Sequence, residues 1–396
     1  MSEISQRARL HHQPVPFWRD VRVLAILTQV VFVLAVALVA GLLYANMTRA
    51  LAQRGLSLGF GFLRLEAGFE IGEGIRYSPS DTYGRAFLVG VVNTLLVSGL
   101  GIVLATILGV IVGVARLSGN WLLTRIAGAY IELIRNTPLL VQLVFWYFAV
   151  ILKLPPVRKS LELPGGIYIH QRGVTLPRLI PTPSFRVWLL FLVAGVILGI
   201  TLWQILTRYQ IRTGRTTRPL TVGFLVLIGL PAAGWFLVGG SPVSWEMPIL
   251  QRFNFTGGRT LTPEFTALLV GLVIYTAAFI AEIVRGGILA VPRGQLEAAR
   301  ALGLSNAQVL RLVIFPQALR IIIPPLTSQY LNLAKNSSLA IAVGYPDLFA
   351  VGGTIANQTG QPVPVIILIM GSYLTMSLVT ALFMNWYNRR VQFVVR

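Results

Sequence analysis

Eight apolar runs in this sequence each approach the length at which a helix crosses a lipid bilayer. One crossing needs about 20 predominantly apolar residues, and a helix satisfies its own backbone hydrogen bonds inside the hydrocarbon region. The runs cover residues 23–45, 86–114, 128–152, 185–206, 220–240, 265–284, 313–334 and 362–386. We therefore predict an all-α, polytopic membrane protein with about eight transmembrane helices.

Composition supports a membrane protein and excludes several other classes. Hydrophobic residues make up 55% of the 396 residues and charged residues 12%, against roughly 25% charged in an average soluble domain. The chain has no cysteine and three histidines, so we expect no metal site and no thiolate chemistry. Acid, base and metal ligands do not converge anywhere in the sequence, which argues against an enzyme.

The basic excess fits membrane topology better than nucleic-acid binding. Lys and Arg number 33 against 13 Asp and Glu, a net charge of +20. The basic residues fall in short loops between the apolar runs, without a basic patch interleaved with aromatic residues, so no nucleic-acid partner is expected. The short loop 207–219 holds four arginines. Placing it in the cytoplasm by the positive-inside rule puts both termini in the cytoplasm too.

Small residues recur every fourth position in the second apolar run. Gly101, Ala105, Gly109 and Gly113 form this stripe, and such spacing lets two membrane helices approach closely. The stripe predicts helix packing. Asn93 lies in the same run, and two interpretations stay open for it: a hydrogen bond between helices, or a contact with substrate.

The stretch 282–316 has the local pattern of two short helices joined by a tight turn. Pro292 suits the first position of a helix, and Gly303 suits the left-handed position just after its end. Ser305 and Gln308 then have the spacing of a capping box that begins the next helix. We predict a short helix, a turn, and a second helix that runs back to the membrane.

The first of these short helices has the features of a docking element. Ala298 and Ala299 give it a small-residue face beside the charged Glu297, a combination that suits a groove in another protein. A helix lying on the lipid headgroups would look similar, and from the residues alone both interpretations stay open.

This stretch resembles the EAA motif of the membrane subunits of bacterial ABC importers. Glu297, Ala298, Ala299, Gly303, Val313, Phe315 and Pro316 carry the resemblance, with Val313 and Phe315 at the positions where the family usually has Ile and Leu. The preceding stretch, and residues 130–142, resemble the branch that transports polar amino acids. The resemblance implies a coupling helix that inserts into an ATP-binding subunit, with these docking residues: Glu297, Ala298, Ala299, Gly303, Arg285, Gly286, Gly287 and Gln295.

The resemblance also implies a fold and a set of partners. It covers the five-helix core of a type I ABC importer, split into residues 86–152 and 264–396. Residues 1–85 add an anchor helix and an outer loop, and residues 153–263 insert two further helices, as in the long subunits of broad-specificity L-amino acid systems. The implied partners are ATP-binding subunits, a second homologous permease chain in a heterodimer, a periplasmic amino-acid-binding protein and membrane lipid.

The energy source is expected on another chain. No phosphate-binding loop of the form G-x4-G-K-[ST] is present, because none of the three lysines follows a glycine. We therefore expect no cofactor on this chain, with ATP and Mg bound by partner subunits. Glu132 and Glu282 each precede an arginine by three residues, Arg135 and Arg285, a spacing typical of neutralising pairs and not of proton relays.

The seventh apolar run contains Pro316, Pro324 and Pro325 and ends in polar residues. Prolines remove backbone hydrogen bonds, and transporters commonly place polar ligands at broken helices near the midplane. A kinked helix whose polar end meets water is the competing interpretation. The predicted translocation path comprises Asn93, Gln142, Gln329, Asn332, Lys335, Asn336 and Ser337.

Together these observations predict the membrane subunit of an ATP-driven amino acid importer in a bacterial inner membrane. It would form the translocation path and couple to a separate ATPase. The alternative is an ion-coupled secondary carrier or channel that works without ATP.

Overall fold

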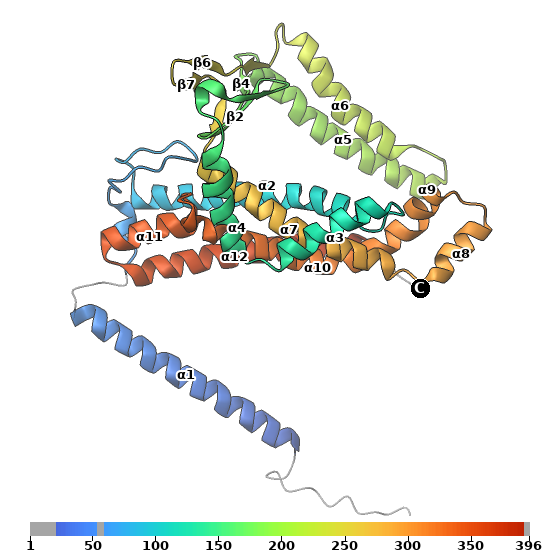
Figure 1. Ribbon diagram of the computed structural model, residues 1–396. Helices are drawn as coiled ribbons and strands as arrows, with labels where there is room; N and C mark the ends of the chain where they lie inside the picture. Colours follow the sequence, from blue (N-terminus) through green and yellow to red (C-terminus); the bar gives the residue numbers. More distant parts are fainter. Residues whose placement is uncertain (1–20, 54–58, 392–396) are drawn as a thin grey trace, which may run out of the picture.

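The computed structural model describes residues 21–53 and 59–391, most of which are helical. Among them, seven helices are long and apolar enough to cross a membrane, or eight if one bent pair counts as a span. Every predicted apolar run overlaps one of these spans, and the predicted helical membrane fold is confirmed (Figure 1). The helices are α1 (Val21–Gln53), α2 (Tyr83–Ala115), α3 (Trp121–Arg135), α4 (Leu139–Val144), α5 (Phe185–Thr213), α6 (Pro219–Leu237), α7 (Pro263–Leu289), α8 (Arg293–Ala301), α9 (Asn306–Gln308), α10 (Phe315–Asn336), α11 (Leu348–Thr359) and α12 (Pro362–Val391).

The third span is broken, and the prediction of one helix over residues 128–152 was wrong. Helix α3 and the segment that begins with α4 meet at an angle of 106°. The break lies between Arg135 and Leu139, and Pro138 is the N-cap residue of α4. A proline disfavours helical geometry in the residue before it, here Thr137. Gln142 stabilises the bend, because its Nε2 donates to the carbonyls of Ile134 at 2.9 Å and Thr137 at 3.0 Å.

The seventh span remains one helix despite its prolines. It is helical from Val309 to Ala342, through a π-helical segment over Val309–Ile314, then α10, then a 3-10 segment over Ser337–Ala342. Pro324 and Pro325 lie inside α10 without a break, so the predicted interruption there is absent. Helices α7 and α12 pack against α10 and support it, which is how membrane bundles tolerate proline.

Helices α2 and α7 pack at the centre of the bundle through the predicted small-residue stripe. A Cβ atom at Gly109 would lie 2.6 Å from Cβ of Ile280, and one at Gly113 would lie 2.7 Å from the carbonyl oxygen of Ala281. Only glycine permits this approach. The stripe therefore does what the spacing predicted, and it brings α2 and α7 into direct contact.

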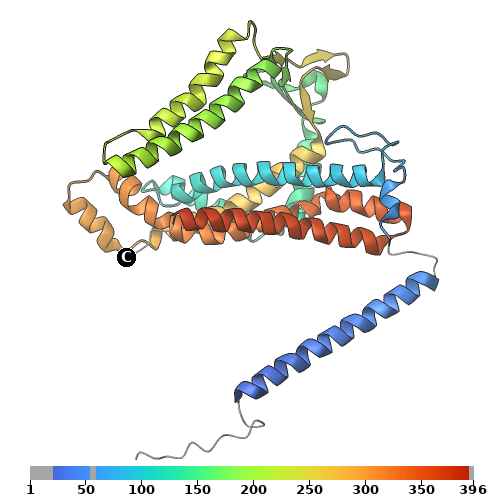
Figure 2. The same cartoon turned by 180° about the vertical axis from the view of Figure 1, so that it is seen from behind.

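Helices α5 and α6 form a hairpin that extends away from the rest of the bundle (Figures 1 and 2). They pack on each other through glycines, since a Cβ at Gly199 would lie 2.9 Å from the carbonyl oxygen of Gly223. Helix α1 stands apart from the bundle in the same views, and none of its membrane-length window is buried. The termini that were predicted to be cytoplasmic, residues 1–20 and 392–396, lie outside the described residues.

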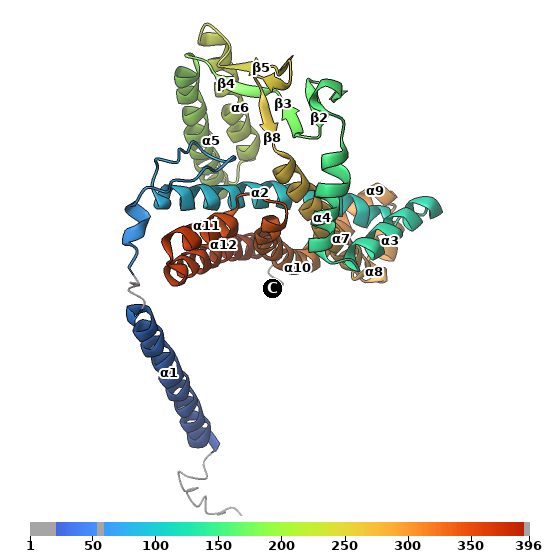
Figure 3. The same ribbon diagram turned by 60° about the vertical axis from the view of Figure 1, so that its left-hand side comes forward.

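Eight short strands flank the hairpin, and they were not predicted from the sequence. They are β1 (Leu161–Leu163), β2 (Ile167–His170), β3 (Gly173–Leu176), β4 (Arg178–Pro181), β5 (Val243–Glu246), β6 (Ile249–Gln251), β7 (Asn254–Thr256) and β8 (Arg259–Leu261). The antiparallel sheet β1-β2-β3-β8 and the pair β4-β5 each join chain from both sides of the hairpin (Figure 3). Three- and four-residue strands give too little alternation to be read from a sequence.

Candidate functional site

Helix α8 lies at the end of the bundle away from α11 and the loop before α2, and it ends as the sequence predicted (Figure 1). Gly303 is left-handed, with a φ of +75°. Its N–H donates to the carbonyl of Arg300 at 2.9 Å, and the N–H of Leu304 donates to that of Ala299 at 3.3 Å. These two bonds form a Schellman motif. Pro292 differs by one position, because it is the N-cap residue and α8 begins at Arg293.

The capping box that begins the following helix is confirmed. The backbone N–H of Ser305 donates to Oε1 of Gln308 at 2.9 Å, and the N–H of Gln308 donates to Oγ of Ser305 at 3.4 Å. Two backbone donors are satisfied by each other's side chains. The turn between α8 and α9 is therefore fixed by local hydrogen bonds on both sides, the Schellman motif at the end of α8 and the capping box at the start of α9.

The surface of α8 differs in part from the expected small-residue face. Glu297 and Ala298 are exposed, but Ala299 is 3% exposed and packs inside the chain. Leu302, which the sequence analysis missed, is 81% exposed at the tip of the turn. An apolar side chain presented so fully beside a short helix is a candidate contact for a partner. A leucine in this position gives no signal in the sequence, since helix periodicity alone does not place it outside.

Other predicted docking residues make contacts within the chain. Arg285 pairs with Glu282, its Nε donating to Oε2 at 3.0 Å, as the spacing predicted. Gln295 accepts a hydrogen bond from Nε2 of Gln317 at 3.4 Å and thereby ties α8 to α10. Gly287 is buried where α7 packs on α10, whereas Gly286 is exposed with open space around it.

The second predicted ion pair is not formed. The guanidinium of Arg135 lies over the ring of Phe279, with Cζ 5.2 Å from the centroid, and the structure gives no pair with Glu132 among the residues it describes. The end of α3 at Asn136 places Arg135 in its last turn, close to α7 and its aromatic residues. A cation–π contact takes the place of the expected neutralising pair.

Three of the predicted path residues hold local structure. Asn93 is buried in α2, and its Nδ2 donates to the carbonyls of Glu73 at 3.2 Å and Pro346 at 2.9 Å. Gln142 supports the bend between α3 and α4. Ser337 is fully buried, with its Oγ donating to the carbonyl of Ala334 at 2.8 Å. Both partners of Asn93 lie in loops, so the hydrogen bond expected between two helices is not the one observed, and a contact with substrate stays a prediction.

The other four predicted path residues lie along α10. Asn332 and Lys335 are exposed, and Gln329 and Asn336 are half-buried. Within the described residues the structure gives none of these side chains a hydrogen bond. Positions 329, 332 and 336 share one face of the helix, so the polar groups form a short stripe beside Lys335.

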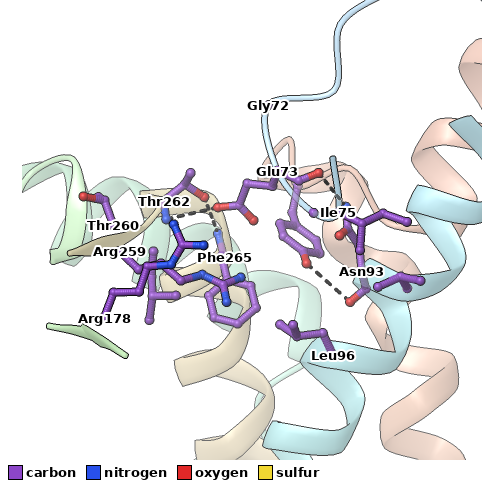
Figure 4. Close-up of a pocket in the computed structure, with 14 residues that line it drawn as sticks. Gly72, Glu73, Ile75, Asn93, Leu96, Arg178, Arg259, Thr260, Thr262 and Phe265 are labelled. Atoms are coloured by element: carbon purple, nitrogen blue, oxygen red, sulfur yellow. Dashed lines mark hydrogen bonds between the residues drawn. The ribbon is translucent and has the colours of Figure 1, made fainter. Parts of the chain in front are cut away.

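A cavity of about 450 Å³, here called the Glu73 cavity, lies near the start of α2 and α7 (Figure 4). The loop before α2, strands β4 and β8 and the first turn of α7 surround it. Oε1 of Glu73 accepts from the backbone N–H of Thr262, the N-cap of α7, at 3.0 Å. The lining residues are Gly72, Glu73, Gly74, Ile75, Val92, Asn93, Leu96, Arg178, Arg259, Thr260, Leu261, Thr262, Phe265 and Tyr345.

Burial sets the electrostatics of Glu73. Loss of solvent raises the pKa of its carboxyl group, the bonds from Thr262 lower it, and the nearby Glu264 raises it further. Arg259 acts in the opposite direction. No sequence pattern identifies this site, because its charged members come from three segments far apart in the chain and none belongs to a motif.

A buried carboxylate lies just beyond the cavity wall. The hydroxyl of Tyr345 donates to the carbonyl of Asn93 at 3.3 Å, and two residues later Asp347 caps α11, accepting from the N–H of Ala350 at 2.9 Å. The hydroxyl of Tyr373 donates to its other oxygen at 3.2 Å. Burial raises the pKa of Asp347 to about 6, although these hydrogen bonds lower it. The chain segment between α10 and α11 is thus fixed to α2 and α12.

Comparison with known proteins places the chain in a family. The sequence pattern described as "binding-protein-dependent transport system inner membrane component" matches residues 214–393. The chain is 48% identical to the putative amino-acid ABC transporter permease protein YhdX of Escherichia coli, over 93% of this chain and 94% of that protein. It is 47% identical to the general L-amino acid transport system permease protein AapQ of Rhizobium johnstonii, over 89% and 88%.

A third relative is the glutamate/glutamine/aspartate/asparagine transport system permease protein BztB of Rhodobacter capsulatus, 40% identical over 94% of this chain and 95% of that protein. Likeness at this level extends across α1, the hairpin and the strands as well as the central bundle. The chain therefore belongs to the family of binding-protein-dependent inner membrane transport components, among the amino-acid ABC transporter permeases.

Proposed function

We propose that this chain is one membrane subunit of an ATP-driven importer of L-amino acids in a bacterial inner membrane, with both termini in the cytoplasm. It works with two ATP-binding subunits, a second homologous permease chain and a periplasmic amino-acid-binding protein. The names of its relatives, which include a general L-amino acid system, support this substrate class. The chain performs no chemistry on the substrate.

Helix α8 is the proposed contact with the ATPase, and its geometry is the observation that carries the proposal. It extends from the end of α7, stops sharply at the Schellman turn, and exposes Glu297, Ala298 and Leu302. A charged residue, a small residue and an apolar tip suit insertion into a groove. Because α8 connects α7 to α10, a push on it reaches two helices of the central bundle.

Energy for transport comes from the partner subunits in this proposal. The full sequence has no phosphate-binding loop, so ATP and Mg bind elsewhere and this chain carries no cofactor. An ion-coupled carrier is not favoured, because the family consists of binding-protein-dependent components and Glu282 is already paired with Arg285.

The translocation path follows the polar stripe of α10 in this proposal. Gln329, Asn332 and Asn336 share a helix face beside Lys335 and have no hydrogen bond to other described residues, which leaves them available to a passing substrate. Residues 86–152 and 264–396 form the transport core, and residues 1–85 and 153–263 are additions to it.

Purification from native membranes in mild detergent, with mass spectrometry of the co-eluting proteins, tests the partners. Recovery of an ATPase with a phosphate-binding loop and of a second permease chain is expected. A chain that elutes alone and transports amino acids in liposomes without ATP would overturn the proposal.

Gly303→Val tests the coupling role of α8. A β-branched residue at a φ of +75° costs on the order of 1–3 kcal/mol and displaces the turn. We expect membrane insertion to persist while ATP-driven uptake in proteoliposomes falls severalfold more than ATP hydrolysis. Gly119→Val is the matched control, because Gly119 is exposed between α2 and α3 with open space around it and no positive φ. Equal uptake by Gly303→Val and wild type would remove α8 from the mechanism.

A further inference from the structure

We propose that the Glu73 cavity is a binding site for a free L-amino acid zwitterion, with Arg178 and Arg259 facing the carboxylate and Glu73 facing the ammonium group. The inference rests on the proposed import function and adds to it a second place where substrate is held. With α8 in the cytoplasm, the cavity lies at the periplasmic end of the bundle, where substrate would arrive.

The cavity has a size and a wall that suit a small amphiphilic molecule. Its volume of about 450 Å³ lies within the range of ligand pockets, roughly 300–1,000 Å³. Val92, Leu96 and Phe265 supply an apolar surface, and Phe265 is 2% exposed and therefore fixed by the core. This apolar part of the lining accepts side chains of different shapes, because apolar contact is not directional.

Two arginines point toward the same space from different strands (Figure 4). Arg178 begins β4 and Arg259 begins β8. Among the described residues, the structure gives neither guanidinium a hydrogen bond or an ion pair. Glu73 offsets part of this positive charge, but one carboxylate against two guanidinium groups leaves an excess of positive charge that attracts a further anion. A guanidinium binds a carboxylate through two parallel hydrogen bonds, so this pair is suited to an α-carboxylate.

Glu73 provides the opposite charge in the same cavity, near enough to Arg259 to feel its positive charge. Its position is fixed, because Oε1 accepts from the N–H of Thr262 and its backbone carbonyl accepts from Asn93. Burial raises the pKa of this carboxyl group, which means that the ionised form lacks solvation. An ammonium group beside it would supply the missing stabilisation. The cavity therefore offers positive groups to an α-carboxylate and a negative group to an ammonium group, the two charges that a zwitterion carries.

The loop that carries Glu73 is held rigidly against α2. Gly74 has a φ of +116°, and a Cβ atom there would lie 2.5 Å from Oδ1 of Asn93. No other residue allows the loop to approach this closely, and the hydrogen bond from Asn93 to the carbonyl of Glu73 holds it in place. A site whose groups are already positioned loses less entropy when a ligand binds.

The inference also gives the inserted segment a role. Both arginines belong to residues 153–263, whereas the apolar wall belongs to α2 and α7. Pairing of β3 with β8 and of β4 with β5 brings the two ends of the insertion together above the core. The insertion thus supplies the carboxylate-binding half of a site that the core alone lacks.

Ligand binding to the purified complex tests the site. The complex, with its co-eluting partners but without binding protein, is placed in lipid nanodiscs and titrated with radiolabelled L-glutamine. Unlabelled 4-carbamoylbutanoate, which lacks the ammonium group, and 4-aminobutanamide, which lacks the carboxylate, serve as competitors. We expect saturable binding of L-glutamine and weaker competition by both analogues.

Four variants separate the charged groups. Arg178→Gln and Arg259→Gln should each weaken L-glutamine binding by about tenfold or more, since each removes charge-assisted hydrogen bonds. Arg259→Lys should retain more affinity than Arg259→Gln. Glu73→Gln should abolish the preference for L-glutamine over 4-carbamoylbutanoate. Arg76→Gln is the matched control, because Arg76 is exposed in the same loop and does not line the cavity.

The outcomes distinguish this site from the import function. The proposed site is rejected if the wild type shows no saturable binding, or if it binds L-glutamine as tightly as the Arg178→Gln/Arg259→Gln double variant does. ATP-dependent import by the wild type would still support the importer function in that case. Variants that bind L-glutamine normally but import poorly with the binding protein would assign the arginines to docking and reject the site. Absence of ATP-dependent import by the wild type would instead reject the proposed function.

Discussion

Backbone conformation at single residues determines the shape of both candidate sites. Gly303 ends α8 in the left-handed region with nothing within 4 Å of a built Cβ, so its requirement is conformational and not steric. Gly74 combines a positive φ with a contact that a side chain would block. Elsewhere a polar side chain fixes the backbone by hydrogen bonds. Gln142 does so at the bend, and Asn93 does so between α2 and the loop that carries Glu73.

Asp347 should make stability depend on pH in a defined direction. Its pKa in the folded protein is raised to about 6 from 3.8, so the folded state binds the proton more tightly than the unfolded state. Its contribution to stability is present below about pH 4 and is lost as pH rises through about 6. Asp347→Asn keeps a side-chain oxygen that can cap α11 but does not titrate, so it should remove the part of the pH dependence of stability that comes from Asp347.

Thermal unfolding in detergent between pH 4 and 7, followed by intrinsic tryptophan fluorescence, measures this effect. The wild type should lose melting temperature relative to Asp347→Asn as pH rises. Parallel curves for the two proteins would show that burial of Asp347 does not shift its titration.

At the scale of elements, close helix approach determines the core. The stripe on α2 was readable from sequence because its period matches a helix face, and the structure gives it a partner, α7. The partner was not readable, since small residues occur in several other helices. The two proline-containing regions behaved differently: Pro138 accompanies a bend of 106°, whereas Pro324 and Pro325 lie in a continuous helix. Tertiary support accounts for the difference.

Gly109→Ala should destabilise the bundle, because the new Cβ would lie 2.6 Å from Ile280 and 3.0 Å from the carbonyl oxygen of Ala277. Overpacking of this kind costs about 1–3 kcal/mol. Gly99→Ala, at a position of the same helix with nothing within 4 Å, is the control and should be neutral or stabilising. Melting temperatures in detergent measure both. Equal melting temperatures for the two variants would mean that α2 and α7 separate easily.

At the scale of the whole molecule, the two candidate sites, α8 and the Glu73 cavity, lie at opposite ends of one bundle. Helices α2 and α7 run from the Glu73 cavity toward the end that carries α8, so a displacement of either helix affects both sites (Figure 1). The α5–α6 hairpin extends to one side and packs chiefly on itself (Figure 2). Its ends meet where the N–H of Thr182 donates to the carbonyl of Pro242 at 3.0 Å.

Deletion of the hairpin should therefore leave the remaining fold in place. Replacing residues 184–240 with a short glycine linker closes a gap whose ends are already hydrogen-bonded, and removing two spans preserves the topology of the rest. We expect insertion, a single peak in size-exclusion chromatography and retained L-glutamine binding. A variant that carries the same linker inserted at Gly214 is the control. If the shortened chain aggregates while this control elutes as a single peak, the hairpin supports the core.

The sequence by itself determined the positions of the membrane spans, though not the break in the third, and also the stripe on α2, the turn at Gly303 and the capping box at Ser305. Each depends on neighbours within one helix turn or on a local run of apolar residues, which is the range over which a sequence can be interpreted. Only the tertiary structure decided that Ala299 is buried, that Arg135 lies over Phe279, and that Glu73 meets two arginines from the insertion. The last two outcomes depend on residues more than 100 positions apart, and the burial of Ala299 depends on how α8 packs on the π-helical segment that follows it. No local pattern specifies which segment a side chain will face.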